Sequence, residues 1–115
     1  EFAGTAKLGA PLPDAPLTRK DETATHLLDT LSGGFELISV KEGDGKNGAR
    51  PRAPDGVALT IIGEDYFDQT GIFTQRLDAT PGAIYLVRPD QHLCARWRRF
   101  DPAAVTRAHR RALQR

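Results

Sequence analysis

A chain of 115 residues with 39% hydrophobic and 27% charged side chains has the size and composition of one globular domain. Its formal charge is +1, and no apolar run approaches the roughly 20 residues of a membrane-spanning helix, which argues against a second domain and against a membrane span. The charge is unevenly divided: residues 1–87 hold eight Lys or Arg against thirteen Asp or Glu, whereas residues 88–115 hold eight Arg against two Asp.

The first 20 residues are rich in Gly, Ala and Pro. This composition favours an extended segment that crosses a surface, so we expect residues 1–20 to be a connecting segment and residues 21–115 to form the domain. The chain contains no Met, opens with Glu1-Phe2, which resembles a cloning-junction remnant, and shows no signal-peptide pattern. We therefore expect an excised piece of a longer protein.

The next segment has a helical pattern. Its apolar residues are spaced at i, i+3, i+4 and i+7: Ala24, Leu27, Leu28 and Leu31. This spacing predicts a short amphipathic helix, with Asp21 or Thr23 as its N-cap and Gly33-Gly34 as its end.

Two strands are expected in the middle of the chain. Residues 35–40 alternate and end in β-forming residues, and residues 57–62 form an apolar run; a polar loop rich in Gly and Pro, residues 41–55, separates them. Between residues 63 and 82 the pattern weakens and allows either a helical turn or a packed loop. The apolar residues available there are Tyr66, Phe67, Ile72, Phe73 and Leu77.

The chain closes with a hairpin and a helix. Residues 83–87 and 92–98 read as antiparallel strands joined by a tight turn, in which Asp90 is expected to bind nearby backbone amides. Alternation places Leu93, Ala95 and Trp97 on the core face, opposite His92, Cys94, Arg96 and Arg98.

Asp101 and Pro102 then read as the N-cap and first-turn proline of a basic helix. We expect its buried side to consist of Val105, Ala108, Ala112 and Leu113, and its outer side of Arg107, Arg110, Arg111 and Arg115. These arginines are either solvated, paired with acidic surface from the first half, or a docking patch for an acidic partner. No nucleic-acid motif favours binding of DNA or RNA.

The sequence offers little support for a dinucleotide site or for thiol redox chemistry. Residues 43–48 fit G-x-G-x-x-G, yet Pro51 and Pro54 intervene before any helix could open, which favours a flexible loop over a dinucleotide site. Thiol redox chemistry needs two cysteines, and only Cys94 exists, within a strand; it suits a structural thiol and a reducing cytoplasm. We expect a cytoplasmic location.

Metal and hydrolytic sites have equally little support. The histidines, His26, His92 and His109, lack ligand spacing, and the serines lack a G-x-S-x-G context. The acidic run of residues 64–68 reads as a solvated turn rather than an acid–base pair. We therefore expect no catalytic, cofactor-binding or metal-binding residue in this chain.

Three stretches resemble one family, the C-terminal domain of FAD-dependent aromatic hydroxylases, which are phenol-hydroxylase-like flavoprotein monooxygenases. They are residues 12–17 (Leu-Pro-Asp-Ala-Pro-Leu), residues 27–37, and residues 86–98 with their Arg88-Pro89-Asp90 turn; the loop of residues 41–55 and residues 63–80 match less well. The resemblance implies an α/β fold, a thioredoxin-like sandwich with a mixed central sheet and flanking helices that lacks the C-x-x-C redox site. It also places Thr80-Pro81 where thioredoxins have a cis-proline.

The resemblance further implies a function through a parent enzyme. That parent, an oxidoreductase, would use FAD and NAD(P)H to hydroxylate an aromatic ring, and this domain would be a non-catalytic accessory that packs on the FAD-binding and substrate-binding domains of the same chain, with a homodimer as a further possibility. Neither nucleic acid, membrane nor metal is an expected partner. The possible interface residues are Trp97, Phe100, Arg107, Arg110 and Arg111. The alternative is a stand-alone interaction module that docks through its basic helix.

Overall fold

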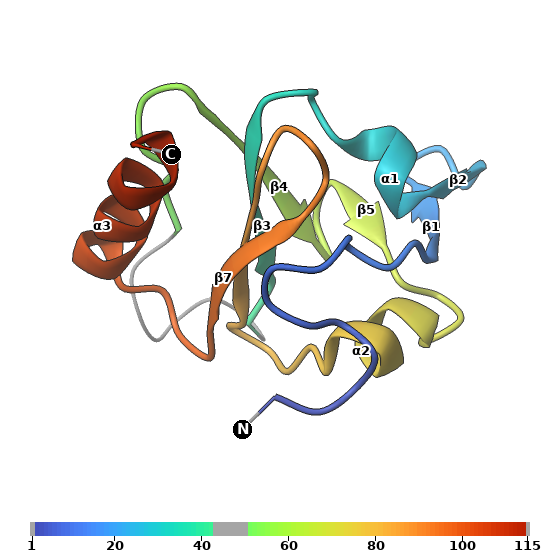
Figure 1. The fold of residues 1–115 in the computed structure, drawn as a ribbon. Coiled ribbons are helices and arrows are strands. Elements are labelled where there is room, and N and C mark those ends of the chain that lie inside the picture. The colour runs from blue at the N-terminus through green and yellow to red at the C-terminus, as the bar shows by residue number, and fades with distance from the viewer. Residues whose placement is uncertain (1, 43–50, 115) are drawn as a thin grey trace.

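The computed structural model describes residues 2–42 and 51–114. Within these residues, seven strands form one mixed sheet in the order β2-β1-β5-β4-β3-β6-β7, and three helices pack around it (Figure 1). The elements are β1 (Pro16–Arg19), β2 (Ala24–His26), α1 (Leu27–Thr30), β3 (Phe35–Val40), β4 (Val57–Ile62), β5 (Tyr66–Phe67), α2 (Ile72–Leu77), β6 (Ile84–Val87), β7 (Leu93–Trp97) and α3 (Pro102–Leu113).

The centre of the sheet has the expected thioredoxin-like α/β arrangement. Strands β3 and β4 pair in parallel, from Phe35 opposite Val57 to Val40 opposite Ile62. Strand β6 lies antiparallel to β3, β7 lies antiparallel to β6, and α3 follows. The expected strands and closing hairpin are thus confirmed. The glycine pattern of residues 43–48 lies outside the described residues.

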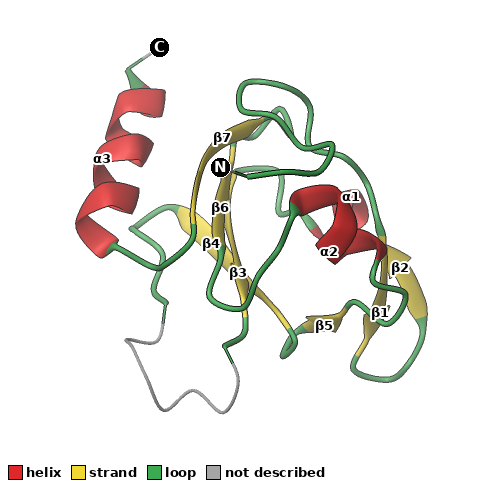
Figure 2. Cartoon of the chain, turned by 90° about the horizontal axis from the view of Figure 1, so that it is seen from below, coloured by secondary structure: helices red, strands yellow, loops and turns green. Residues whose placement is uncertain are grey.

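Helices cover both faces of the sheet (Figure 2). On one face, α1 and α2 bury Leu27, Phe73 and Leu77 against side chains of the central strands, such as Ile38 and Tyr85. On the other face, α3 lies over a separate cluster. Its buried members are Leu37, Ile84, Leu86, Val105 and Ala108. We call these the α2-side core and the α3-side core.

The N-terminal 20 residues contribute to the domain. Residues Pro16–Arg19 form β1, which pairs with β2 on one side and β5 on the other. Ala6, Leu12, Ala15 and Leu17 are buried in the α2-side core. The segment that we expected to connect therefore also adds a strand and core side chains.

The helix expected around residues 24–31 is mostly wrong. Residues Ala24–His26 form β2, whose backbone pairs with β1, and only the four residues of α1 are helical. Neither Asp21 nor Thr23 caps it; instead Asp14 Oδ1 accepts a hydrogen bond of 3.0 Å from the N–H of Leu28. Pairing with β1 outweighs the helical spacing of the apolar residues: Ala24 is exposed on β2, whereas Leu27, Leu28 and Leu31 contact the α2-side core.

A bulge in β7 corrects the predicted core face. Leu86 lies opposite Ala95 and Val87 lies opposite Leu93, so Cys94 is an extra residue on β7. Leu93 therefore belongs to the α2-side core, whereas Ala95 and Trp97 pack against the α3-side core. The prediction that these three side chains share one face is wrong, because regular alternation ends at the bulge.

Helix α3 begins as predicted. Asp101 caps it by accepting from the N–H of Ala104 at 3.2 Å, and Pro102 stands in the first turn. The expected burial of Leu113 is wrong: its exposed fraction is 59%. His109 is buried instead and packs edge-on against Phe35, because the inner stripe follows i, i+3, i+4 from Val105.

Residues 63–82 contain β5 and α2, so the helical alternative for this region is confirmed. The acidic run is structural rather than simply solvated. The carboxylate of Asp68 accepts from the N–H groups of Phe73 and Thr74, and that of Asp65 accepts from the N–H of Ile61 at 2.8 Å. The described residues contain no cis peptide bond, so the Thr80-Pro81 bond, whose form the sequence left open, is trans.

The outer side of β4 meets β5 at one position only, where Ile62 pairs with Tyr66. Ile61 is bonded instead by the turn that follows: its N–H donates to Asp65, and its carbonyl accepts from the N–H groups of Glu64 and Asp65. Among the described residues, no helix is long and apolar enough to cross a membrane.

Candidate functional site

The five residues expected at an interface differ in burial. Trp97 and Phe100 are half-buried against the α3-side core, whereas Arg107, Arg110 and Arg111 are exposed on α3. The two aromatic rings therefore contact the core, and the three arginines do not; an interface role for these five residues stays a prediction. Arg110 and Arg111 lie in the C-terminal half of α3, as does exposed Leu113, and the helix dipole favours positive charge at this end.

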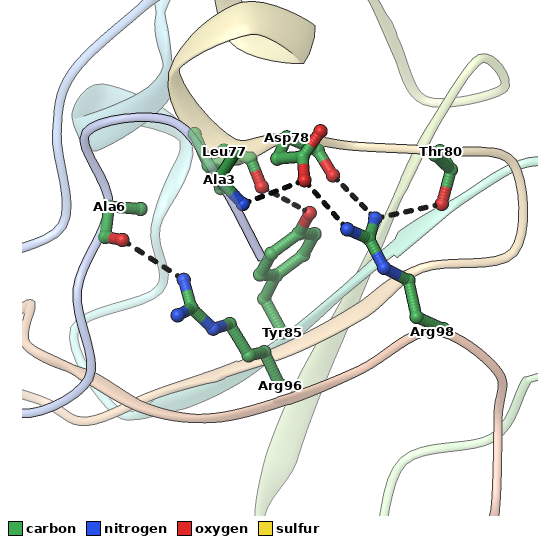
Figure 3. Close-up of polar contacts among 8 residues, drawn as sticks. All are labelled: Ala3, Ala6, Leu77, Asp78, Thr80, Tyr85, Arg96 and Arg98. Atoms are coloured by element: carbon green, nitrogen blue, oxygen red, sulfur yellow. Dashed lines mark hydrogen bonds and ion pairs between the residues drawn. The ribbon is translucent and has the colours of Figure 1, made fainter. Parts of the chain in front are cut away.

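A second polar site joins the start of the chain to the sheet (Figure 3). Its centre is an ion pair between Arg98, which follows β7, and Asp78, which follows α2: Nη2 lies 2.6 Å from Oδ2. The same guanidinium donates to the carbonyl of Asp78 at 2.8 Å and to Thr80 Oγ1 at 3.1 Å. Arg98 thus ties the end of β7 to the segment between α2 and β6.

The Asp78 carboxylate also binds the N-terminal segment. Its Oδ2 accepts from the N–H of Ala3 at 2.8 Å, besides the guanidinium of Arg98 (Figure 3). The pKa of Asp78 is lowered from its ordinary value, mainly by the hydrogen bond from the N–H of Ala3 and secondly by the one from Arg98. Both contacts favour the ionised carboxylate.

Further contacts hold the next residues of this segment. Arg96 Nη1 donates to the carbonyl of Ala6 at 3.0 Å, and the N–H groups of Thr5 and Ala6 both donate to the carbonyl of Arg76, each at 3.0 Å. Arg76 lies in the last turn of α2, where carbonyls lack intrahelical partners. The N-terminal segment therefore caps the end of α2.

Aromatic rings complete this site. Tyr85 of β6 is fully buried and donates its hydroxyl to the carbonyl of Leu77 at 2.8 Å; burial raises its pKa. The ring of Phe2 meets Tyr85 edge-on, with centroids 5.9 Å apart, and lies beneath the guanidinium groups of Arg96 and Arg98. We call the group Asp78, Tyr85, Arg96 and Arg98 the arginine clamp.

The clamp was missed by sequence reasoning. Alternation placed Arg96 and Arg98 opposite Trp97, which is correct, but it predicted no contact between these arginines and the start of the chain. The sequence shows two arginines on one strand face and an aromatic residue at the start of the chain. It does not show that they meet, because they are 94 or more positions apart. Such a distance in sequence leaves no periodic pattern.

A cleft of about 560 Å³ opens between the end of β1 and the outer side of β4. It is lined by Arg19, Lys20, Asp21, Leu59, Thr60, Asp65 and Tyr66. Thr60 donates its hydroxyl to the buried carboxylate of Glu36, which also accepts from the N–H of Ser32 at 3.0 Å. Because these partners satisfy both carboxylate oxygens, Glu36 serves to hold β3, β4 and the loop after α1 together.

The remaining reactive side chains have structural roles. Cys94 is half-buried at the bulge of β7, in a strand as expected. In the hairpin turn, Asp90 accepts from the N–H of His92 at 3.2 Å, as expected, and pairs with Arg88 at 2.5 Å. The residues described contain no group of three His, Cys, Asp or Glu side chains that could hold a metal ion.

The chain matches one protein family and resembles several solved structures. Residues 5–115 match a family described as aromatic-ring hydroxylase, C-terminal. No curated protein matches the chain. Among solved structures, the ternary complex of aklavinone-11 hydroxylase with FAD and aklavinone is similar with a TM-score of 0.65 and 18% identity, over 90% of this chain and 20% of that one.

Two further structures resemble the chain. The flavin-dependent monooxygenase PieE, in complex with FAD and substrate, has a TM-score of 0.67 and 24% identity, over 94% of this chain and 21% of that one. The Diels-Alderase PyrE3 of pyrroindomycin biosynthesis has a TM-score of 0.50 and 25% identity, over 87% and 18%. The chain therefore spans about a fifth of the length of these proteins.

Proposed function

The chain belongs to the aromatic-ring hydroxylase family, as its C-terminal domain, and on that premise we propose that it is the non-catalytic accessory domain of a FAD- and NAD(P)H-dependent aromatic-ring monooxygenase. The family match over residues 5–115 carries the proposal. Two similar structures, each about five times longer, are complexes with FAD, which supports a flavin in the parent. We further propose a cytoplasmic parent, since a reducing compartment suits Cys94.

The described residues do not fit a dinucleotide. A flavin or nicotinamide pyrophosphate is usually held by N–H groups at a helix N-terminus. Of the helices in residues 2–42 and 51–114, α1 and α2 span four and six residues, and the N-terminus of α3 is taken by the Asp101 carboxylate, which would repel a phosphate. The FAD and NAD(P)H sites of the parent would therefore lie in its other domains.

In this proposal the domain packs on the catalytic body of the same chain. NAD(P)H would supply the hydride and bound FAD the oxygen chemistry, while the protein would orient the substrate and exclude water. The exposed arginines of α3 together with Leu113 offer a contact surface, and Arg is one of the residues enriched at interfaces. Alternatively, this surface contacts a second copy of the parent in a homodimer.

The test uses the natural parent polypeptide, purified uncut under native conditions. We expect a chain several times longer than this one, with a flavin absorption spectrum and NAD(P)H-dependent hydroxylation of a phenol. A parent that ends before this domain is expected to keep its flavin and to lose thermal stability. A colourless parent close to 115 residues would contradict the proposal, and loss of flavin on truncation would contradict the accessory role.

The contact surface is tested in the same parent. Replacing Arg107, Arg110 and Arg111 together by Glu is expected to lower the midpoint of thermal unfolding, because reversed charge at a complementary surface is repulsive. Arg52, an exposed arginine before β4, provides the control substitution to Glu. Equal midpoints for the triple variant and the wild type would mean that this side of α3 faces solvent.

A further inference from the structure

We propose that the arginine clamp is a docking site for the segment that connects this domain to the rest of the parent chain, with an aromatic side chain as its anchor. The inference rests on the proposed function, since it supposes a preceding domain. The occupant is the chain's own segment from Phe2 to Ala6, which lies across the end of α2 and against β7 (Figures 1 and 3).

The ring of Phe2 is held by charge as well as by packing. The guanidinium carbon of Arg98 lies 3.8 Å from the ring centroid, and that of Arg96 lies 4.6 Å from it. A guanidinium within about 6 Å of an aromatic centroid is attracted by the negative face of the ring. An aliphatic side chain at position 2 could fill the space but would lose both attractions, so the clamp selects an aromatic residue.

The backbone that follows is recognised residue by residue. The N–H of Ala3 donates to the carboxylate of Asp78, and the carbonyl of Ala6 accepts from the guanidinium of Arg96. The N–H groups of Thr5 and Ala6 both donate to the backbone carbonyl of Arg76. Ala6 itself is buried, with 3% of its surface exposed. A loosely attached linker would make none of these contacts, so the segment leaves the domain in a fixed direction.

Gly4 completes the pattern that the clamp recognises. Its φ is +86°, and a Cβ at this position would stand 2.6 Å from the carbonyl oxygen of Arg76 and 2.8 Å from that of Gln75. The docked segment therefore requires an aromatic residue, any residue with an N–H, and then glycine. Because Glu1-Phe2 resembles a cloning-junction remnant, the anchor role requires the natural parent to carry an aromatic residue of its own directly before Ala3. A polar residue there would overturn the anchor role.

Hydrogen exchange of the 115-residue chain tests docking without any flavin. In Phe2→Ala, we expect the amides of Ala3, Thr5 and Ala6 to exchange about 5-fold faster or more, because two cation–π contacts are lost. Phe2→Trp should keep the slow rates. Arg98→Gln should speed the same amides, and the matched variant Arg107→Gln on α3 should not.

The amide of Leu37 in the central strand β3 serves as an internal control, because its exchange reports unfolding of the whole domain rather than undocking. Equal rates for Ala3, Thr5 and Ala6 in the wild type and in Phe2→Ala would overturn the proposal. Equal acceleration of all amides, Leu37 included, would also overturn it, since it would assign Phe2 to global stability. Either result leaves the flavin test of the parent unaffected.

Discussion

At the scale of single residues, several side chains act far from their neighbours in sequence. Asp14 and Asp68 bind N–H groups of α1 and α2 from outside each helix, and Glu36 joins Ser32 to Thr60 from a buried position. A polar group is buried at low cost only where it has such hydrogen-bond partners. Through these contacts, acidic residues hold elements together in the fold, and Asp68 does so although the sequence predicted a solvated turn.

Gly4 and Gly9 give a matched pair of substitutions. Both have a positive φ, of +86° and +79°, but an added Cβ meets backbone oxygens at Gly4 and has nothing within 4 Å at Gly9. Gly9→Ala should cost about 1–2 kcal/mol through its left-handed backbone alone. Gly4→Ala should also release the N-terminal segment. Exchange of the Thr5 and Ala6 amides distinguishes the two, and slow exchange in Gly4→Ala would contradict the close approach.

Asp90 in the hairpin turn gives a prediction for pH dependence. The guanidinium of Arg88 is the main cause that lowers the pKa of Asp90 from 3.8 to about 2. Because the folded pKa is the lower one, this group stabilises the fold above about pH 4 and loses that contribution as the pH falls from about 4 to about 2. The effect on stability should be small, since the Asp90 side chain is 53% exposed and the ion pair is screened by solvent.

An NMR titration of the Asp90 carboxyl group checks this directly. We expect a midpoint near 2 in the wild type and a rise toward 3.8 in Arg88→Gln. Arg107→Gln, remote on α3, should leave the midpoint unchanged. A wild-type midpoint close to 3.8 would show that the ion pair does not persist in solution.

At the scale of elements, local sequence patterns predicted the regular strands and the start of the last helix. The strands β3, β4, β6 and β7 and the cap of α3 follow from alternation, apolar runs and the Asp101-Pro102 pair. The sequence could not show that residues 24–26 pair with β1, that Cys94 makes a bulge, or that Arg96 and Arg98 meet Phe2. Each depends on contacts between segments distant in sequence, which outweigh local propensity.

The cap of α3 provides the prediction at this scale. Asp101→Ala should lower the free energy of unfolding by about 1 kcal/mol, because the N–H of Ala104 loses its acceptor. Asp101→Ser should recover most of that loss. Urea unfolding measures both variants, with Asp55→Ala in the exposed loop before β4 as the control. A cost for Asp101→Ala no greater than for Asp55→Ala would contradict capping.

At the scale of the whole molecule, one sheet carries two cores. The α2-side core and the α3-side core lie on opposite faces of the central strands, and adjacent residues of β3, Leu37 and Ile38, belong one to each. A strand cannot lose its packing on one face and keep its position on the other. The two cores should therefore unfold together.

This cooperativity can be measured by comparing a local signal from the α3-side core with a signal from the whole fold. Trp97, the only tryptophan of the chain, packs against the α3-side core. Leu77→Ala opens a cavity in the α2-side core and should cost about 2–5 kcal/mol. Its thermal midpoint should fall equally by Trp97 fluorescence and by far-UV circular dichroism. A midpoint unchanged in fluorescence alone would reveal two independent units.

The turn after β4 also protects the protein against self-association. Because the Asp65 carboxylate and the amides of Glu64 and Asp65 occupy the backbone groups of Ile61, that stretch of edge offers no ladder to an incoming strand. Asp65→Ala would free the Ile61 amide beside the apolar run of β4. At high concentration, such a variant should scatter light and bind thioflavin sooner than the wild type, so one carboxylate would set the chain's resistance to fibril growth.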